Sequence, residues 1–125
     1  MATHPRRITA RTSAPDQPDR LPRRVYVFER ATGADLTALN RRVAACYAWA
    51  DARQIAVLDE IIDWSGFPGR HERPQLAEAV AACERDHAGL LVHSPDAVRA
   101  HPGMTIQLKS RLARLIVVTA CGPTP

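Results

Sequence analysis

Short apolar runs alternate with amphipathic segments along this chain, and this alternation constrains the fold more than any other feature. The runs at 25–28, 55–62, 90–92 and 115–119 are rich in β-branched residues and are predicted to be strands. Between them, apolar residues recur every three or four positions, which indicates helices. Strands that alternate with helices favour a parallel sheet covered on both sides by right-handed crossovers. We therefore predict an α/β fold: a small three-layer sandwich around a mostly parallel four-stranded sheet, in the order β-α-β-α-β-α-β.

The limits of the expected elements are marked by local signals. Thr32 and Asp35 have the spacing of a capping box at the start of the first helix. Pro74 suits the first turn of the second helix, and Gly89 is expected to provide its left-handed C-cap. The run at 55–62 is apolar on both faces, as in a buried parallel strand. The apolar stripes are Leu36, Leu39, Val43, Tyr47 and Ala50 in the first helix, Leu76, Ala79, Val80 and Cys83 in the second, and Met104, Leu108, Leu112 and Leu115 in the third.

The positive charge of the chain is concentrated at its N-terminus. The chain has 125 residues and a formal net charge of +4, and residues 1–24 contain six arginines against two aspartates. The rest has equal numbers of basic and acidic residues, so the folded part has no overall basic field. Residues 1–22 are predicted to be a disordered tail, because they have too few apolar side chains to offset their ordering entropy. We expect the domain to span 23–121, with a short tail at 122–125. The arginines that we expect to contact DNA are Arg6, Arg7, Arg11, Arg20, Arg23 and Arg24.

Cysteine spacing and hydropathy exclude several classes of protein. The three cysteines form no C-x-x-C pair, so neither a disulfide framework nor a zinc site is indicated, and a cytoplasmic protein is expected. Cys46 and Cys83 are expected in the core, because they lie on apolar helix faces. No run approaches the ~20 apolar residues of a membrane span. A metal or acid–base site could be assembled from His93, Asp96, His101, Asp63, His71 and Glu72. Their spacing does not require such a site, and we predict no metal and no cofactor.

Four short motifs, in order, resemble the catalytic domain of serine recombinases, the resolvase/invertase family. They are the segment 26–30 before a turn and a helix, Ser65-Gly66, the segment 73–76, and the segment 91–96. The resemblance covers about 24–121 and implies the resolvase catalytic-domain fold. It also implies site-specific DNA recombination, in which a serine attacks a DNA phosphate while arginines neutralise the charge of the transition state.

The resemblance is weakest at the positions that carry the family's chemistry. Arg30 occupies the position of the nucleophilic serine, and Phe28 that of the first arginine. The residues that still correspond to the family's site are Tyr26, Ser65, Arg73 and Asp96, with Arg99 displaced by one place. Family members continue into a dimer helix and a helix-turn-helix domain, whereas this chain ends at Pro125. The resemblance therefore implies a degenerate and truncated member.

A recombinase-like domain without its nucleophile is predicted to be a non-catalytic DNA-associated or regulatory module. Its expected partners are DNA, bound weakly through the N-terminal tail, and a full-length recombinase or a second copy of the chain; no membrane is expected. One alternative is a protein-interaction α/β module with no nucleic-acid role, since fold does not determine function. The enzymatic alternatives are phosphoryl transfer by Thr32 or Ser65 with Arg30, Arg73 and Arg99, and small-molecule chemistry in a crevice at His93 and Asp96.

Overall fold

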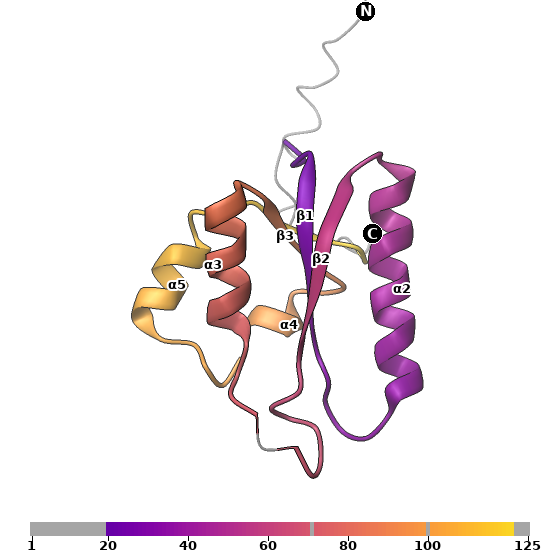
Figure 1. Ribbon diagram of the computed structural model, residues 1–125, viewed down its shortest axis with the longest axis vertical. Helices are drawn as coiled ribbons and strands as arrows, with labels where there is room; N and C mark the ends of the chain where they lie inside the picture. The colour runs from indigo at the N-terminus through magenta and orange to yellow at the C-terminus, as the bar shows by residue number, and fades with distance from the viewer. Residues whose placement is uncertain (1–19, 71, 100, 122–125) are drawn as a thin grey trace, which may run out of the picture.

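A four-stranded parallel sheet forms the middle layer of the molecule (Figure 1). The computed structural model describes residues 20–70, 72–99 and 101–121. The strands are β1 (Arg24–Arg30), β2 (Ala56–Asp63), β3 (Gly89–Val92) and β4 (Val117–Thr119). Their order in the sheet is β2-β1-β3-β4, and every neighbouring pair is parallel. The predicted α/β fold is confirmed.

Helices cover both faces of this sheet. They are α2 (Leu36–Ala52), α3 (Leu76–Asp86), α4 (Asp96–Arg99) and α5 (Ile106–Leu112). Helix α2 lies on one face, and α3, α4 and α5 lie on the other (Figure 1). Successive strand residues point to opposite faces, so β1 supplies two separate cores. Phe28 packs in the cluster on the α3 side, and Val27 packs with Cys46 on the α2 side.

Strand β2 is parallel to β1 as expected, but the prediction that it is buried was wrong. It forms one edge of the sheet, and Leu58 in its middle is 42% exposed. The pairing register shifts at this point, because Val25 pairs with Val57 whereas Tyr26 pairs with Asp59. The apolar β-branched run therefore identified the strand, but the prediction of burial passed over Asp59 and Glu60 in its middle, which are exposed.

Helix α2 begins three residues later than the capping-box spacing indicated. Asp35 is the N-cap, and its carboxylate accepts a hydrogen bond of 3.0 Å from the backbone N–H of Ala38. Thr32 is therefore not the capping residue. Two residues of the expected apolar stripe are not buried: Leu36 is 47% exposed and Tyr47 is 39% exposed.

The connection from α3 to β3 shows why Gly89 is a glycine. The left-handed C-cap of α3 is His87, with φ 53°, and not Gly89 as predicted. A Cβ atom on Gly89 would lie 2.7 Å from Cγ of Pro22 and 2.9 Å from the carbonyl oxygen of Ile116. The chain that leads into β1 thus packs directly on the start of β3.

At the other end of α3 the N-cap is Gln75, so Pro74 precedes the helix instead of lying in its first turn.

Several sequence predictions fall on parts of the chain outside the described residues. These are residues 1–19 of the predicted disordered tail, the short tail at 122–125, and the side chains of Arg6, Arg7, Arg11 and His71. Leu115, which was expected in the third helix, lies beyond the end of α5. Among the described residues, no helix combines the length and the apolar character needed to cross a membrane.

Candidate functional site

The first candidate site is a hollow of about 260 Å³ at the carboxyl ends of β1 and β3. The helix that follows β1 covers one face of the sheet and the helix that follows β3 covers the other, so the two connections diverge at this point. Ligands of open α/β sheets bind at such switch points. The hollow is lined by Glu29, Arg30, Thr32, Arg42, Ser94, Asp96 and Ala97.

An internal ion pair uses two of the four charged groups in this hollow. The Glu29 side chain is almost fully buried, and its Oε1 accepts a hydrogen bond of 2.9 Å from Nε of Arg42. Its Oε2 accepts a second bond of 2.9 Å from the backbone N–H of His93. Arg42 also donates to the carbonyl oxygen of Arg30 at 2.9 Å. The pair therefore ties α2 to the ends of β1 and β3, and it neutralises its own charge.

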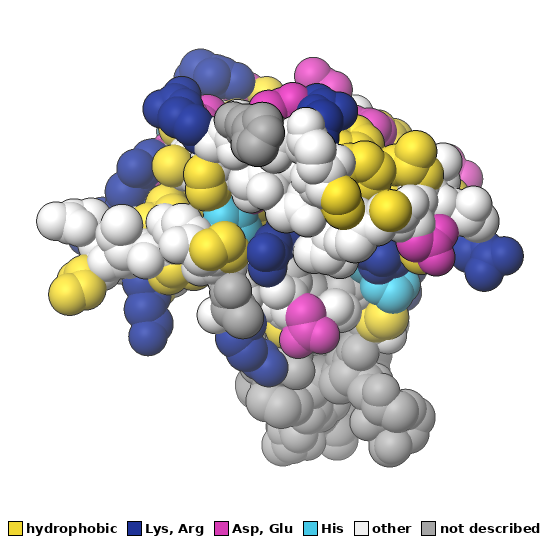
Figure 2. All heavy atoms as spheres, turned by 90° about the horizontal axis from the view of Figure 1, so that it is seen from below, with side chains coloured by type: hydrophobic (Ala, Val, Ile, Leu, Met, Phe, Trp, Pro, Cys, Tyr) yellow, Lys and Arg dark blue, Asp and Glu magenta, His cyan; other side chains and the backbone are white. Residues whose placement is uncertain are grey.

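The other two charged groups of the hollow are Arg30 and Asp96. Arg30 is half-buried and Asp96 is exposed, and neither forms an ion pair with another described residue. A Cβ atom on Gly66 would lie 4.0 Å from Nη2 of Arg30, so the Ser65-Gly66 loop is adjacent to the hollow. Figure 2 views the molecule from this end and shows basic and acidic side chains interspersed.

The predicted recombinase-like residues do not assemble into one site. Arg30 and Asp96 share the hollow, but Arg73 has an 84% exposed side chain that lies 3.7 Å from Glu78. Arg99 lines a different hollow of about 430 Å³, between α4, α5 and β4. The three arginines that were considered for phosphate chemistry thus point to three different places.

Tyr26 is also remote from the carboxyl ends of the strands. Its hydroxyl donates a hydrogen bond to the carboxylate of Asp86 at the end of α3, and it accepts one of 3.2 Å from Nη2 of Arg85. The bond to Asp86 raises the pKa of Tyr26 above its ordinary value. Tyr26 therefore fastens α3 to β1 and does not face a reacting group at the switch point.

Two members of the predicted metal or acid–base group form a buried structural pair. Asp63 and His101 have no exposed side-chain surface, and Nε2 of His101 donates to the Asp63 carboxylate. The backbone N–H of Gly103 donates to Nδ1 of His101 at 2.9 Å, which leaves Nε2 to carry the proton. The carboxylate also accepts bonds from the backbone N–H groups of Ser65 at 2.8 Å and Gln75 at 3.2 Å. Burial alone would raise the pKa of Asp63, but hydrogen bonds from Ser65 and His101 outweigh it, and the pKa is lowered.

This pair closes the β2–α3 loop onto the segment before α5, and solvent does not reach it. The described residues contain no group of three or more His, Cys, Asp or Glu side chains that could hold a metal ion. His93 and Asp96 do not line the same hollow: the ring of His93 instead lies 3.4 Å from the sulfur of Cys121.

The three cysteines are free thiols, two of them in the core and one at the surface. Cys46 and Cys83 are fully buried, and Cys121 is exposed. Burial raises the pKa of Cys46 to about 12 and that of Cys83 to about 11. The prediction of two core thiols is therefore confirmed.

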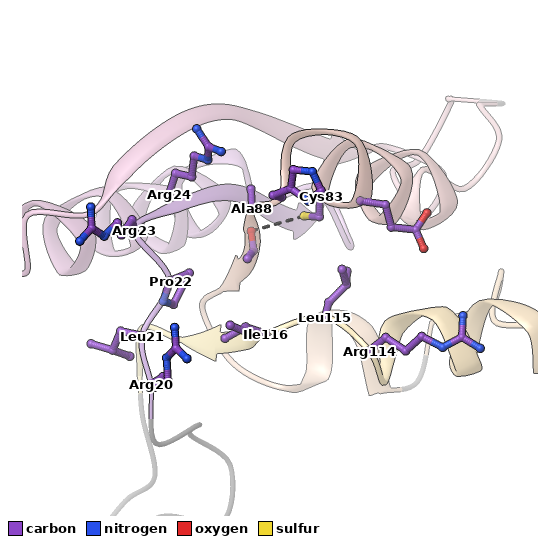
Figure 3. A pocket seen from close by; sticks show the side chains of 13 residues that line it. Arg20, Leu21, Pro22, Arg23, Arg24, Cys83, Ala88, Arg114, Leu115 and Ile116 are labelled. Atoms are coloured by element: carbon purple, nitrogen blue, oxygen red, sulfur yellow. Dashed lines mark hydrogen bonds between the residues drawn. The ribbon is translucent and has the colours of Figure 1, made fainter. Parts of the chain in front are cut away.

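The second candidate site is a cleft of about 690 Å³ at the amino ends of the strands (Figure 3). The segment 20–24 runs along one side of this cleft, and the segment 114–116 runs along the other (Figure 3). Its lining comprises Arg20, Leu21, Pro22, Arg23, Arg24, Cys83, Glu84, His87, Ala88, Gly89, Arg114, Leu115 and Ile116. We call this the arginine cleft.

The arginine cleft carries positive charge that the neighbouring acidic groups do not neutralise. Glu84 is bound by both Nε and Nη2 of Arg111, at 3.0 and 2.6 Å, and Asp86 is bound by Arg85 at 3.0 Å. These hydrogen bonds lower the pKa of both carboxyl groups. The four arginines that line the cleft form no ion pair with another described residue; they are Arg20, Arg23, Arg24 and Arg114.

Sequence reasoning found three of these four arginines and missed Arg114. Arg20, Arg23 and Arg24 are close together in a basic segment, whereas Arg114 follows α5 and joins them only because β3 and β4 are neighbours.

No family model, no curated protein and no solved structure matches this chain. The function of the protein is therefore inferred from the geometry of its two candidate sites.

Proposed function

We propose that this protein is a non-catalytic DNA-associated module that binds the phosphate backbone through the arginine cleft. One observation carries the proposal: four arginines from the two ends of the described chain line one cleft, while the carboxylates beside it are bound by other arginines. A guanidinium group presents planar, paired donors that match two phosphate oxygens. Exposed cations of this kind contribute affinity without reading sequence.

The carboxyl ends of the strands support the non-catalytic part of the proposal. Phosphoryl transfer requires a nucleophile and several cations directed at the same phosphate. At the switch point Arg30 replaces the nucleophile and Arg42 is bound to Glu29, while Arg73 and Arg99 lie elsewhere. We therefore expect binding without strand cleavage.

The resemblance to serine recombinases is the reason for choosing DNA among polyanions, and a full-length recombinase or a second copy as partner remains a prediction. We place the protein in the cytoplasm, because its three cysteines are free thiols, which are typical of a reducing compartment.

The proposal is tested by fluorescence anisotropy of the full chain with a labelled DNA duplex over a series of salt concentrations. Each of Arg23→Ala, Arg24→Ala and Arg114→Ala should weaken binding. Each should also reduce the slope of log K against log salt by roughly 0.9, because one phosphate contact is lost. The matched control is Arg41→Ala, which removes an exposed arginine of α2 with no ion pair to a described residue. This control should leave the slope unchanged.

Two results would overturn the proposal. If Arg41→Ala weakens binding as much as Arg114→Ala, the DNA responds to net charge and not to the arginine cleft. If a nicked duplex yields a covalent protein–DNA adduct on a denaturing gel, the protein is catalytic. Arg6→Ala, Arg7→Ala and Arg11→Ala measure the contribution of the N-terminal segment in the same assay.

A further inference from the structure

We infer that the hollow at the carboxyl ends of β1 and β3 binds a small zwitterion, a molecule of the amino-acid class with one carboxylate and one ammonium group. This site is independent of the proposed DNA binding, because it lies at the other end of the sheet and shares no lining residue with the arginine cleft.

The first support is the position of the hollow. It lies at the switch point of the sheet, where open α/β folds bind their ligands. Its walls come from the ends of two central strands and from α2, and the Glu29–Arg42 pair holds these elements together. A site on such a scaffold keeps its shape without a ligand.

The second support is the pattern of charge. Two arginines and two carboxylates line the hollow, so a ligand of net charge leaves one group uncompensated, whereas a zwitterion does not. Glu29 and Arg42 satisfy each other, which leaves Arg30 from the end of β1 and Asp96 from the start of α4. The Arg30 guanidinium suits the carboxylate of the ligand, and Asp96 suits its ammonium group. Thr32 and Ser94 add hydroxyls that can donate or accept.

The third support is the size and polarity of the hollow. Its volume of about 260 Å³ is below the roughly 300–1,000 Å³ of pockets for drug-sized ligands. Ala97 is its only apolar lining residue within the described chain. The hollow therefore suits a ligand of few atoms that is polar at both ends, and it is too small to enclose a nucleotide.

The experiment is a titration of the ¹⁵N-labelled full chain, followed by amide chemical shifts. The probes are glycine, β-alanine and γ-aminobutyrate, which separate the same two charges by increasing lengths. Acetate and methylammonium supply each charge alone. We expect one of the three zwitterions to bind at least threefold more tightly than acetate or methylammonium, with the largest shifts at 29–32 and 94–97.

Variants assign the two ends of the ligand. Arg30→Gln should weaken zwitterion binding about two- to fivefold and abolish acetate binding, while it leaves methylammonium binding unchanged. Asp96→Asn should do the reverse, and the exposed Arg41→Gln should change none of these affinities. If acetate binds as tightly as every zwitterion, or if the shifts lie outside these segments, the inference is wrong. Absence of binding by all three zwitterions also overturns it. The DNA assay with Arg114→Ala reports on the other end of the sheet, so the two proposals fail separately.

Discussion

The sheet has arginines at both ends: at the carboxyl ends Glu29 neutralises Arg42 and leaves Arg30 open, whereas at the amino ends none of the four arginines of the cleft is paired with a described residue. At the carboxyl ends, Glu29 holds Arg42, and the buried Asp63 holds His101. At the amino ends, the arginines that line the cleft have no ion pair with a described residue. Internally paired charges connect elements of the fold, whereas open charges are available to a partner. The comparison separates the structural arginines of this protein from those that can bind.

The largest effect is expected where a paired group is fully buried. Asp63→Ala leaves the donors of His101, Ser65 and Gln75 without an acceptor. We expect the free energy of unfolding to fall by about 3–5 kcal/mol, because three hydrogen-bond donors lose their acceptor at roughly 1–3 kcal/mol each. Urea denaturation of wild type and variant measures this loss. A loss below about 1 kcal/mol would show that the pair does not fasten the carboxyl end of the sheet.

The second-largest loss of stability is expected for Gly89, at the amino end of β3. Gly89→Ala brings a Cβ atom within 2.7 Å of Pro22, so the segment 20–24 must move. We expect a loss of about 1–3 kcal/mol in unfolding free energy from overpacking, together with weaker DNA binding. Gly66→Ala is the control, since its Cβ would meet nothing closer than 3.4 Å. If the Gly89→Ala protein is destabilised but binds DNA with unchanged affinity, the packing of Pro22 on Gly89 is not needed for DNA binding by the arginine cleft.

Two neighbouring arginines at the carboxyl end test the distinction directly. Arg42→Ala removes the charge partner of the buried Glu29 and should cost about 1–3 kcal/mol of unfolding free energy. Arg30→Ala removes a side chain with no ion pair to a described residue, and should stay within about 0.5 kcal/mol of wild type. Thermal and urea unfolding compare the two variants. If both variants lose the same unfolding free energy, Arg42 is no more structural than Arg30, and the distinction between paired and open arginines at this end is wrong.

The smallest effect is a change with pH. The pKa of Asp63 is lower in the folded protein than its ordinary value near 3.9, so its stabilisation is complete above about pH 4 and is lost as the pH falls through the folded value. Asp63→Asn removes this titration. The difference in unfolding free energy between wild type and Asp63→Asn should therefore shrink as the pH is lowered from about 6 into this acidic range. A difference that is independent of pH would show that folding does not shift the pKa of Asp63.

Local patterns predicted the elements of this fold, because helix and strand periodicity is a property of adjacent residues. The stripe of Leu76, Ala79, Val80 and Cys83 is buried throughout, and β1, β3 and β4 fall in the expected runs. The predictions that were wrong concern properties that depend on which residues are neighbours in space. The apolar run of β2 was predicted to be buried although it lies at the sheet edge, and the periodicity of α2 placed Leu36 and Tyr47 in the core although both are exposed.

The candidate sites were harder to predict for the same reason. Arg30 and Asp96 were each identified from a short motif, but their shared hollow exists only because β1 and β3 are neighbours. Arg114 carried no local signal and joins Arg23 through the packing of β4 beside β3. Tyr26 and Arg73 matched a sequence motif, yet their contacts with Asp86 and Glu78 place them away from the switch point.

The exposed edge of the sheet has a consequence for how copies of this protein meet. An open strand offers unpaired backbone donors and acceptors to any other strand. In β2, two exposed acidic residues, Asp59 and Glu60, occupy the middle of that edge. If two copies paired antiparallel about this point, their carboxylates would stand opposite one another, and like charges across a strand pair repel. The same residues that make β2 a poor core strand thus keep the sheet from growing into an intermolecular one.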